Sequence, residues 1–118
     1  MNRHRVEYGR YAQRHLDELW NYVADVNSAQ AADRLVLQII EYCDALSDFP
    51  HRGHVREDIG PGIRVYGYQR RAAVAFTVTE AVVEILGIYW GGRDYEPPLH
   101  AQLTEDDQHL SPSDQARY

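Results

Sequence analysis

Arginine, histidine and tyrosine side chains in the middle and second half of the chain have the types that acid–base chemistry on a phosphodiester needs. The cations are Arg64, Arg70, Arg71 and Arg93, and the candidate proton carriers are His51, His54, Tyr89 and Tyr95. Metal-independent RNA cleavage uses a base for the 2′-hydroxyl, cations that stabilise the phosphorane and an acid for the leaving oxygen. If the chain is a nuclease, Arg64, Arg71 and Arg93 are its expected catalytic residues.

The two histidines fall in the segment PHRGHVREDIGPG (50–62), whose glycines and prolines predict a surface loop. Loop histidines without a carboxylate at a fixed spacing are expected to be solvated. The pattern H-x-x-H has no third ligand at a recognisable spacing, so it does not predict a metal site. We expect neither a metal nor a cofactor.

A second hypothesis for the arginines is a binding surface. Arg64, Tyr66 and Tyr68 recur at two-residue spacing, which places them on one face of a strand, and Arg70 and Arg71 follow directly. Charged residues on an outward sheet face often serve solubility alone. A mixture of arginine and aromatic side chains on one face also fits a protein interface.

Three apolar segments, residues 63–68, 73–79 and 82–90, predict the strands that position these side chains. Their short connections favour antiparallel pairing. The segment 82–90 is apolar almost throughout, which predicts an interior strand buried on both faces. Trp90 ends this strand, where it either caps the core or stands exposed beside Arg93.

Two amphipathic helices precede the strands. One runs from about residue 11 to 27, and a second begins after Ser28, which can cap it, and ends before Pro50. Their short connection predicts an antiparallel hairpin packed on the sheet. Residues 5–8 could form an edge strand. The fold class is therefore α+β, with a short N-terminal strand and a helical hairpin on a mainly antiparallel sheet.

Composition predicts one folded domain of residues 1–95, followed by an acidic tail of residues 96–118. The chain has 118 residues, 44% of them hydrophobic, and its single cysteine, Cys43, lies in a helical pattern that predicts burial. Pro97-Pro98 should stop regular structure, so we expect the tail to be flexible or to bind a partner. We expect a cytoplasmic protein with no membrane contact, because no apolar run approaches a bilayer span and the N-terminus lacks the features of a signal peptide.

Charge is unevenly distributed along the chain. The net charge is −6, yet residues 49–71 hold five arginines against two acids, whereas residues 10–48 hold three arginines against seven acids. The acidic total argues against a nucleic-acid binder, although the middle of the chain is basic.

The order of the elements and several short stretches resemble the RelE/ParE superfamily of toxins from type II toxin–antitoxin pairs, and the ParE branch most closely. These stretches are Ala12, Leu16 and YVA (22–24), Ala32 and Leu46, FPHRG (49–53), GPGIR (60–64), VEIL (83–86) and GRD (92–94). The resemblance covers about residues 5–95 and implies the RelE/ParE-like α+β fold.

A ParE-like protein is expected to inhibit DNA gyrase without covalent chemistry of its own, and so to cause growth arrest and plasmid stabilisation. The resemblance also implies a hetero-oligomer with a ParD-like antitoxin, and no sequence-specific nucleic-acid binding. The expected antitoxin-binding residues are Arg64, Tyr66, Tyr68, Arg70 and Arg71. The expected target-binding residues are Trp90, Arg93 and Tyr95.

Two departures from the superfamily separate the alternatives. Ala73 stands roughly where RelE-type nucleases have a basic residue, and Trp90 replaces the usual histidine before the Gly-x-Arg-Asp stretch. Of the RNA-cleaving set, only Arg93 has a plausible counterpart, which favours a gyrase inhibitor over an enzyme. A ribosome-dependent mRNA endonuclease of the RelE type, and an inactive relative that only binds an antitoxin, remain alternatives.

Overall fold

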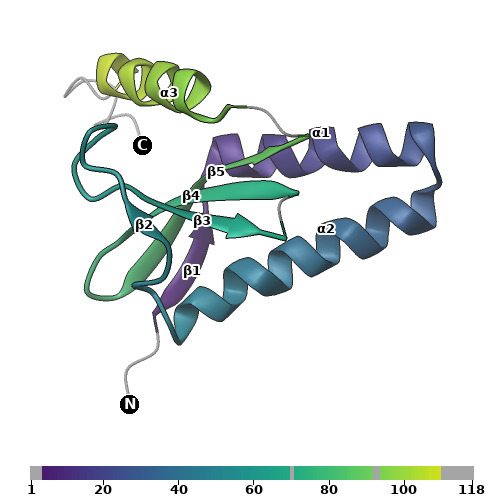
Figure 1. Cartoon of the computed structure of the whole chain (residues 1–118), viewed down its shortest axis with the longest axis horizontal. Coiled ribbons are helices and arrows are strands. Elements are labelled where there is room, and N and C mark those ends of the chain that lie inside the picture. Colours follow the sequence, from purple (N-terminus) through teal and green to yellow (C-terminus); the bar gives the residue numbers. More distant parts are fainter. Residues whose placement is uncertain (1–3, 70, 92–93, 110–118) are drawn as a thin grey trace.

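A five-stranded sheet lies between a helical hairpin on one face and a single helix on the other (Figure 1). The computed structural model describes residues 4–69, 71–91 and 94–109, with side chains as far as residue 104. The elements are β1 (Arg5–Tyr8), α1 (Arg10–Val26), α2 (Ala29–Asp44), the 3-10 helix η1 (Ala45–Ser47), β2 (His54–Val55), β3 (Arg64–Tyr68), β4 (Ala72–Val78), β5 (Val82–Trp90) and α3 (Glu96–His109). Among the described residues, no helix is long and apolar enough to cross a membrane.

The strands follow the spatial order β1-β5-β4-β3-β2. Neighbours pair antiparallel except β1, which pairs parallel to β5 from Arg5 opposite Val82 to Tyr8 opposite Ile85. The predicted α+β class, the edge position of residues 5–8 and the interior position of residues 82–90 are confirmed.

A bulge in β5 explains why this strand is apolar on both faces. Ala75 pairs with Gly87 and the next residue, Phe76, pairs with Ile85, so Leu86 is an extra residue in β5. The alternation therefore shifts by one position. Val83, Ile85 and Ile88 face the helical hairpin, and Leu86 and Tyr89 face α3.

The hairpin forms as the sequence predicts. Ser28 Oγ accepts a hydrogen bond from the Ala31 N–H at 3.0 Å and caps α2. The apolar sides of both helices bury side chains against the sheet, among them Leu19 on α1 and Ile39 and Cys43 on α2, which are at most 3% exposed. Burial raises the pKa of the Cys43 thiol to about 12.

The expectation that Pro97 and Pro98 stop regular structure is wrong, because α3 begins at Glu96. Both prolines occupy the first turn, where a helix does not need the N–H groups that proline lacks. Asp94 Oδ1 accepts the Glu96 N–H at 3.0 Å. Leu99 is fully buried in the cluster on this face of the sheet, so the first part of the predicted tail is packed against the domain. The division of the chain at residue 95 stays a prediction.

Polar contacts also hold α3 on the sheet. Buried Gln102 donates to the carbonyl of the bulge residue Leu86 at 2.8 Å and accepts from the Tyr89 hydroxyl at 2.8 Å. Arg56 donates to Glu96 Oε2 at 2.8 Å, to both oxygens of Asp58, and to the Tyr95 hydroxyl. The Gln102 amide thereby supplies a partner for the carbonyl of the bulge residue.

Candidate functional site

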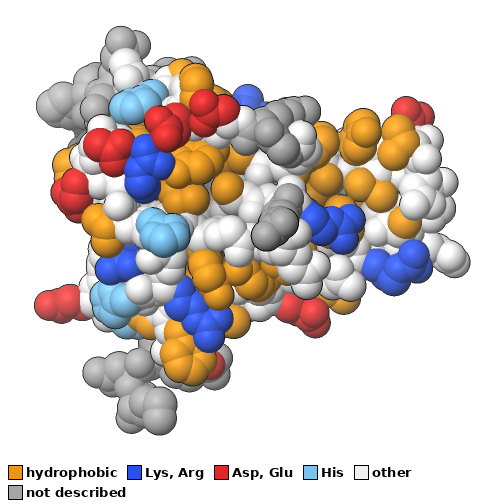
Figure 2. Space-filling view, in the orientation of Figure 1, with side chains coloured by type: hydrophobic (Ala, Val, Ile, Leu, Met, Phe, Trp, Pro, Cys, Tyr) orange, Lys and Arg blue, Asp and Glu red, His pale blue; other side chains and the backbone are white. Residues whose placement is uncertain are grey.

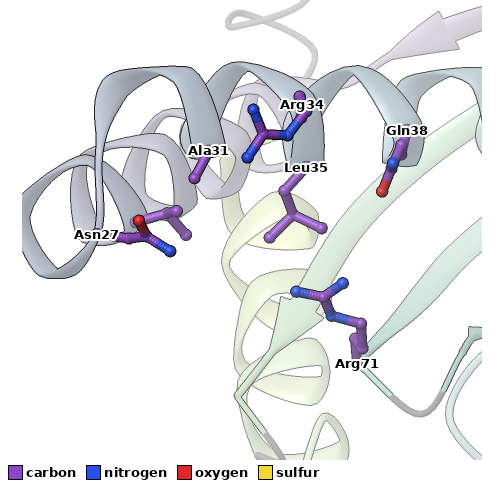
Figure 3. Close-up of a pocket in the computed structure, with 7 residues that line it drawn as sticks. Asn27, Ala31, Arg34, Leu35, Gln38 and Arg71 are labelled. Carbon is purple, nitrogen blue, oxygen red and sulfur yellow. The ribbon is translucent and has the colours of Figure 1, made fainter.

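A concave surface runs along the side of α2 that faces the β3–β4 turn. It consists of three adjoining hollows of about 370, 290 and 630 Å³, and Arg71 lines all three. We call this surface the hairpin groove. Figure 3 shows its middle part, where α2 lies above and Arg71 approaches from the strand side.

One end of the hairpin groove is apolar. Its lining residues are Leu19, Tyr22, Val23, Leu35, Ile39, Arg71, Trp90 and Gly91. The ring centroids of Tyr22 and Trp90 lie 5.3 Å apart, and the Tyr22 side chain is 53% exposed. Trp90 is half-buried and packs against the core on the hairpin side, so it caps the core and also forms part of the groove wall.

The middle of the hairpin groove is cationic. Arg34 on α2 and Arg71 before β4 both line this part: the Arg34 guanidinium lies beside α2, and Arg71 directs its guanidinium toward Leu35 from the strand side (Figure 3). The Arg71 N–H donates to the Tyr68 carbonyl at 2.7 Å, which fixes the turn that places Arg71. Two guanidinium groups beside an aliphatic side chain suit a partner that offers a carboxylate next to an apolar residue.

The other end of the hairpin groove is polar, with Gln38, Glu41, Tyr42, Tyr68 and Gln69 along its walls. The Tyr68 hydroxyl donates to Gln38 Oε1 at 3.3 Å. Gln69 has φ of 47°, an uncommon value for a residue with a side chain. The groove therefore has an apolar part, a cationic part and a polar part, all bordered by α2.

Comparison with known proteins identifies the family and supports the fold. The family model of the ParE toxin of the type II toxin–antitoxin system parDE matches residues 6–95. The chain belongs to the ParE toxin family. A solved structure described as the chromosomal ParDE system from P. aeruginosa has the same fold, with a TM-score of 0.65 and 23% identity over 74% of this chain and 95% of that chain. No curated protein gives a significant match.

The ParE family range ends at residue 95, so α3 lies beyond it. In this ParE family member α3 nevertheless covers the sheet face opposite the hairpin, where it packs on Ile59, Ile63 and Val65. The hairpin groove lies on the other side of the sheet and is built entirely from residues within the family range.

The predicted antitoxin-binding residues of this ParE family member do not share an outward face. Tyr68 is 5% exposed in the core beneath the hairpin, and Tyr66 stacks on Tyr42 of α2 with ring centroids 4.7 Å apart. The expectation of a solvent-facing row is wrong because α2 covers this face of β3. Burial raises the pKa of Tyr42, whereas hydrogen bonds from Tyr42 and then from Arg52 lower the pKa of Tyr66.

The predicted cations are distributed along the sheet. Arg64 begins β3 and donates to the carbonyls of His51 and Arg52 at 2.8 and 3.3 Å, whereas Arg71 follows β3 and enters the groove. Arg70 and Arg93 lie outside the described residues. His51 and His54 are exposed, and no group of three or more His, Cys, Asp or Glu side chains in the described part of the chain is placed to hold a metal ion.

Two of the predicted target-binding residues belong to opposite faces. Trp90 packs on the hairpin side, and Tyr95 packs in the cluster beneath α3, with its ring centroid 6.4 Å from that of Tyr89. Arg56 donates to the Tyr95 hydroxyl, and hydrogen bonds to Asp58 and then Glu96 raise the Arg56 pKa. The assignment of Trp90, Arg93 and Tyr95 to target binding stays a prediction.

Sequence reasoning missed two residues, one in the hairpin groove and one that supports the sheet. Arg34 was assigned no role because it is a single cation on a helix, although it lies next to the apolar stripe residue Leu35. His15 was also missed: its Nδ1 accepts the Ile88 N–H at 3.0 Å and so satisfies a β5 amide where α1 lies against the strand. No local pattern signals that contact, which joins positions 73 residues apart.

Proposed function

We propose that this chain is the toxin of a ParDE-type pair, that a ParD-like antitoxin neutralises it by occupying the hairpin groove, and that the free protein inhibits DNA gyrase in the cytoplasm. The family match over residues 6–95 carries the toxin assignment. A solved relative described as a ParDE system supports a partner in a hetero-oligomer. Growth arrest and plasmid stabilisation would follow from gyrase inhibition.

The dimensions of the hairpin groove suit one helical segment of the antitoxin. Its α2 wall runs from Ala31 to Tyr42, eleven residues apart, or about 16 Å at 1.5 Å per residue. An antitoxin helix of about three turns would match this length. Its apolar side chain would fill the end beside Trp90, and a carboxylate would face Arg34 and Arg71, where charge-assisted hydrogen bonds are strong.

The placement of the arginines supports an inhibitor rather than a nuclease. Arg64 and Arg71 flank the two ends of β3, and the four steps from Arg64 to Tyr68 alone span about 13 Å. The Arg64 guanidinium is also engaged by two loop carbonyls. The cations that stabilise a phosphorane must lie close together around it. Arg64 and Arg71 are too far apart along β3 to do so.

A growth assay tests the proposal. Expression of this chain alone should arrest growth, and co-expression of its ParD-like antitoxin, which we expect an adjacent gene to encode, should restore it. Arg71→Glu should weaken that rescue, because a carboxylate in the groove would repel the antitoxin carboxylate. Arg5→Glu is the matched control, since Arg5 is exposed on β1 at the far edge of the sheet.

Each outcome distinguishes the alternatives. No arrest from a folded, expressed chain would favour an inactive relative that only binds an antitoxin. Arrest that the adjacent protein relieves equally in the wild type and in Arg71→Glu would keep the toxin assignment and refute the groove as the antitoxin site.

A further inference from the structure

A second surface combines an exposed arginine with stacked aromatic rings. We call Phe49, Arg52, Tyr66 and Tyr42 the arginine–aromatic platform. The Arg52 guanidinium carbon lies 4.6 Å from the Phe49 ring centroid and 5.8 Å from that of Tyr66, and Nη1 donates to the Tyr66 hydroxyl at 2.9 Å. Tyr66 in turn stacks on Tyr42 with an interplanar angle of 13°. The cation is thus held between two rings.

The loop that carries this platform is fixed before any partner arrives. Arg64 donates to the His51 and Arg52 carbonyls. Gly53 has φ of 83°, and a Cβ there would lie 2.4 Å from the Val65 carbonyl oxygen, so the loop passes close against β3. A surface that is ordered in advance loses less conformational entropy on binding.

The platform adjoins the end strand of the sheet and is positively charged. Residues 49–56 contain two arginines and two histidines and no acid. Phe49 and Val55 are 57% and 50% exposed, large values for apolar side chains. Figure 2 shows basic, histidine and hydrophobic side chains side by side over the β2–β3 end of the sheet, whereas acidic side chains gather higher in the view, near α3.

The edge of β2 adds backbone groups to this surface. The Arg56 N–H donates inward to the Ile63 carbonyl at 2.7 Å, and alternation along β2 therefore turns the N–H and C=O of Val55 away from β3. An extended peptide could pair with them, as in β-strand addition.

The platform is continuous with the hairpin groove, because Tyr42 belongs to both. We propose that the platform is a second docking surface for the same antitoxin, and that it takes an extended segment in which a carboxylate lies next to an apolar side chain. The carboxylate binds Arg52, the apolar side chain packs on Phe49 and Val55, and the backbone pairs with Val55. This inference rests on the proposed function, since it assumes that the antitoxin helix fills the hairpin groove.

Titration calorimetry with the antitoxin purified from the adjacent gene tests the inference. Arg52→Gln should weaken binding about tenfold and reduce its salt dependence, because one charge-assisted hydrogen bond is lost. Arg52→Lys should recover part of the affinity, since it keeps the charge without the planar stacking. Phe49→Ser should also weaken binding. Arg5→Gln is the control at the opposite edge of the sheet and should leave affinity unchanged.

Antitoxin truncations identify the segment involved. An antitoxin shortened at the end that follows its groove helix should bind the wild type and Arg52→Gln equally, yet still lose affinity for Arg71→Gln. Thermal unfolding of each free variant checks that it remains folded, and Phe49→Ser serves as the second test if Arg52→Gln does not fold.

The two proposals fail in different ways. If Arg71→Gln weakens binding but the platform variants do not, the platform inference is overturned and the groove assignment stands. If neither set changes the affinity, the groove assignment is refuted together with the platform inference, and if the antitoxin does not bind the wild type, the proposed pairing with an antitoxin is refuted.

Discussion

Replacing Leu99 by alanine tests whether α3 is part of the folded domain. Leu99 is fully buried in the cluster that Ile59, Ile63 and Val65 form with it on the outer sheet face. Replacing a buried leucine by alanine leaves a cavity and lowers the free energy of unfolding by about 2–5 kcal/mol. Because α3 is an outer layer that can move to fill part of the cavity, we expect Leu99→Ala to lower the free energy of unfolding by about 3 kcal/mol.

Urea and thermal unfolding of the full chain measure this change. For a domain of this size each kcal/mol lowers Tm by roughly 4 °C, so Leu99→Ala should lower Tm by about 12 °C. The midpoint of urea unfolding should fall in proportion to the loss of stability. The slope of the free energy of unfolding against urea concentration should not change if the denatured state is unaffected.

Leu37→Ala is the matched control because it makes the same chemical change at an exposed site. The Leu37 side chain on α2 is 56% exposed, so its loss should change stability by no more than about 0.5 kcal/mol. Equal effects of the two substitutions, both near zero, would show that α3 is not packed on the sheet and would refute the reasoning.

Three further predictions concern the same layers. Gly87→Ala should destabilise the chain to urea by about 1–3 kcal/mol, because the new Cβ would lie 2.5 Å from the Tyr89 hydroxyl oxygen. The hydrogen bond from Arg56 lowers the Asp58 pKa. The stabilisation from this ion pair should therefore be full above about pH 4 and be lost as the pH falls through the folded-state pKa of Asp58. The difference in Tm between the wild type and Asp58→Asn should shrink to zero on acidification. Cys43, whose pKa is raised to about 12, should not react with a thiol reagent at pH 8 until urea unfolds the chain.

The elements with a clear hydrophobic period were predictable from the sequence. The stripe that includes Leu35 and Ile39 has one dominant buried face, and alternation places Val74 and Phe76 together on the hairpin side of β4, so local pattern identifies these elements directly. Ser28 supplied the boundary between the helices, and the structure shows it as the cap of α2. The antiparallel pairing followed from short connections.

The faces of β3 could not be predicted because both are covered. Alternation separates Val65 from Tyr66 and Tyr68 correctly, but it does not say which side meets solvent, and the tyrosines look suited to either. The hairpin covers one side and α3 the other. The helix α3 is not predictable from the prolines, which usually stop a helix but here occupy positions in its first turn where a helix tolerates them.

The candidate site was predicted only in part. Arg71 was expected at a binding surface and lines the whole hairpin groove, but Arg34 joins it from a helix 37 positions earlier in the chain. The arginine–aromatic platform depends on contacts between positions such as Arg52 and Tyr66, which are adjacent only after β2 and β3 pair. The spacing of residues along the sequence does not predict such contacts unless the fold is already known.

The measurement that tests the central claim most directly is plasmid supercoiling by purified gyrase in the presence of the antitoxin-free protein. The account predicts a loss of supercoiling that the antitoxin reverses. Undiminished supercoiling, together with cleaved mRNA in a translating extract given the same protein, would contradict it and assign the chain to the ribosome-dependent nucleases instead.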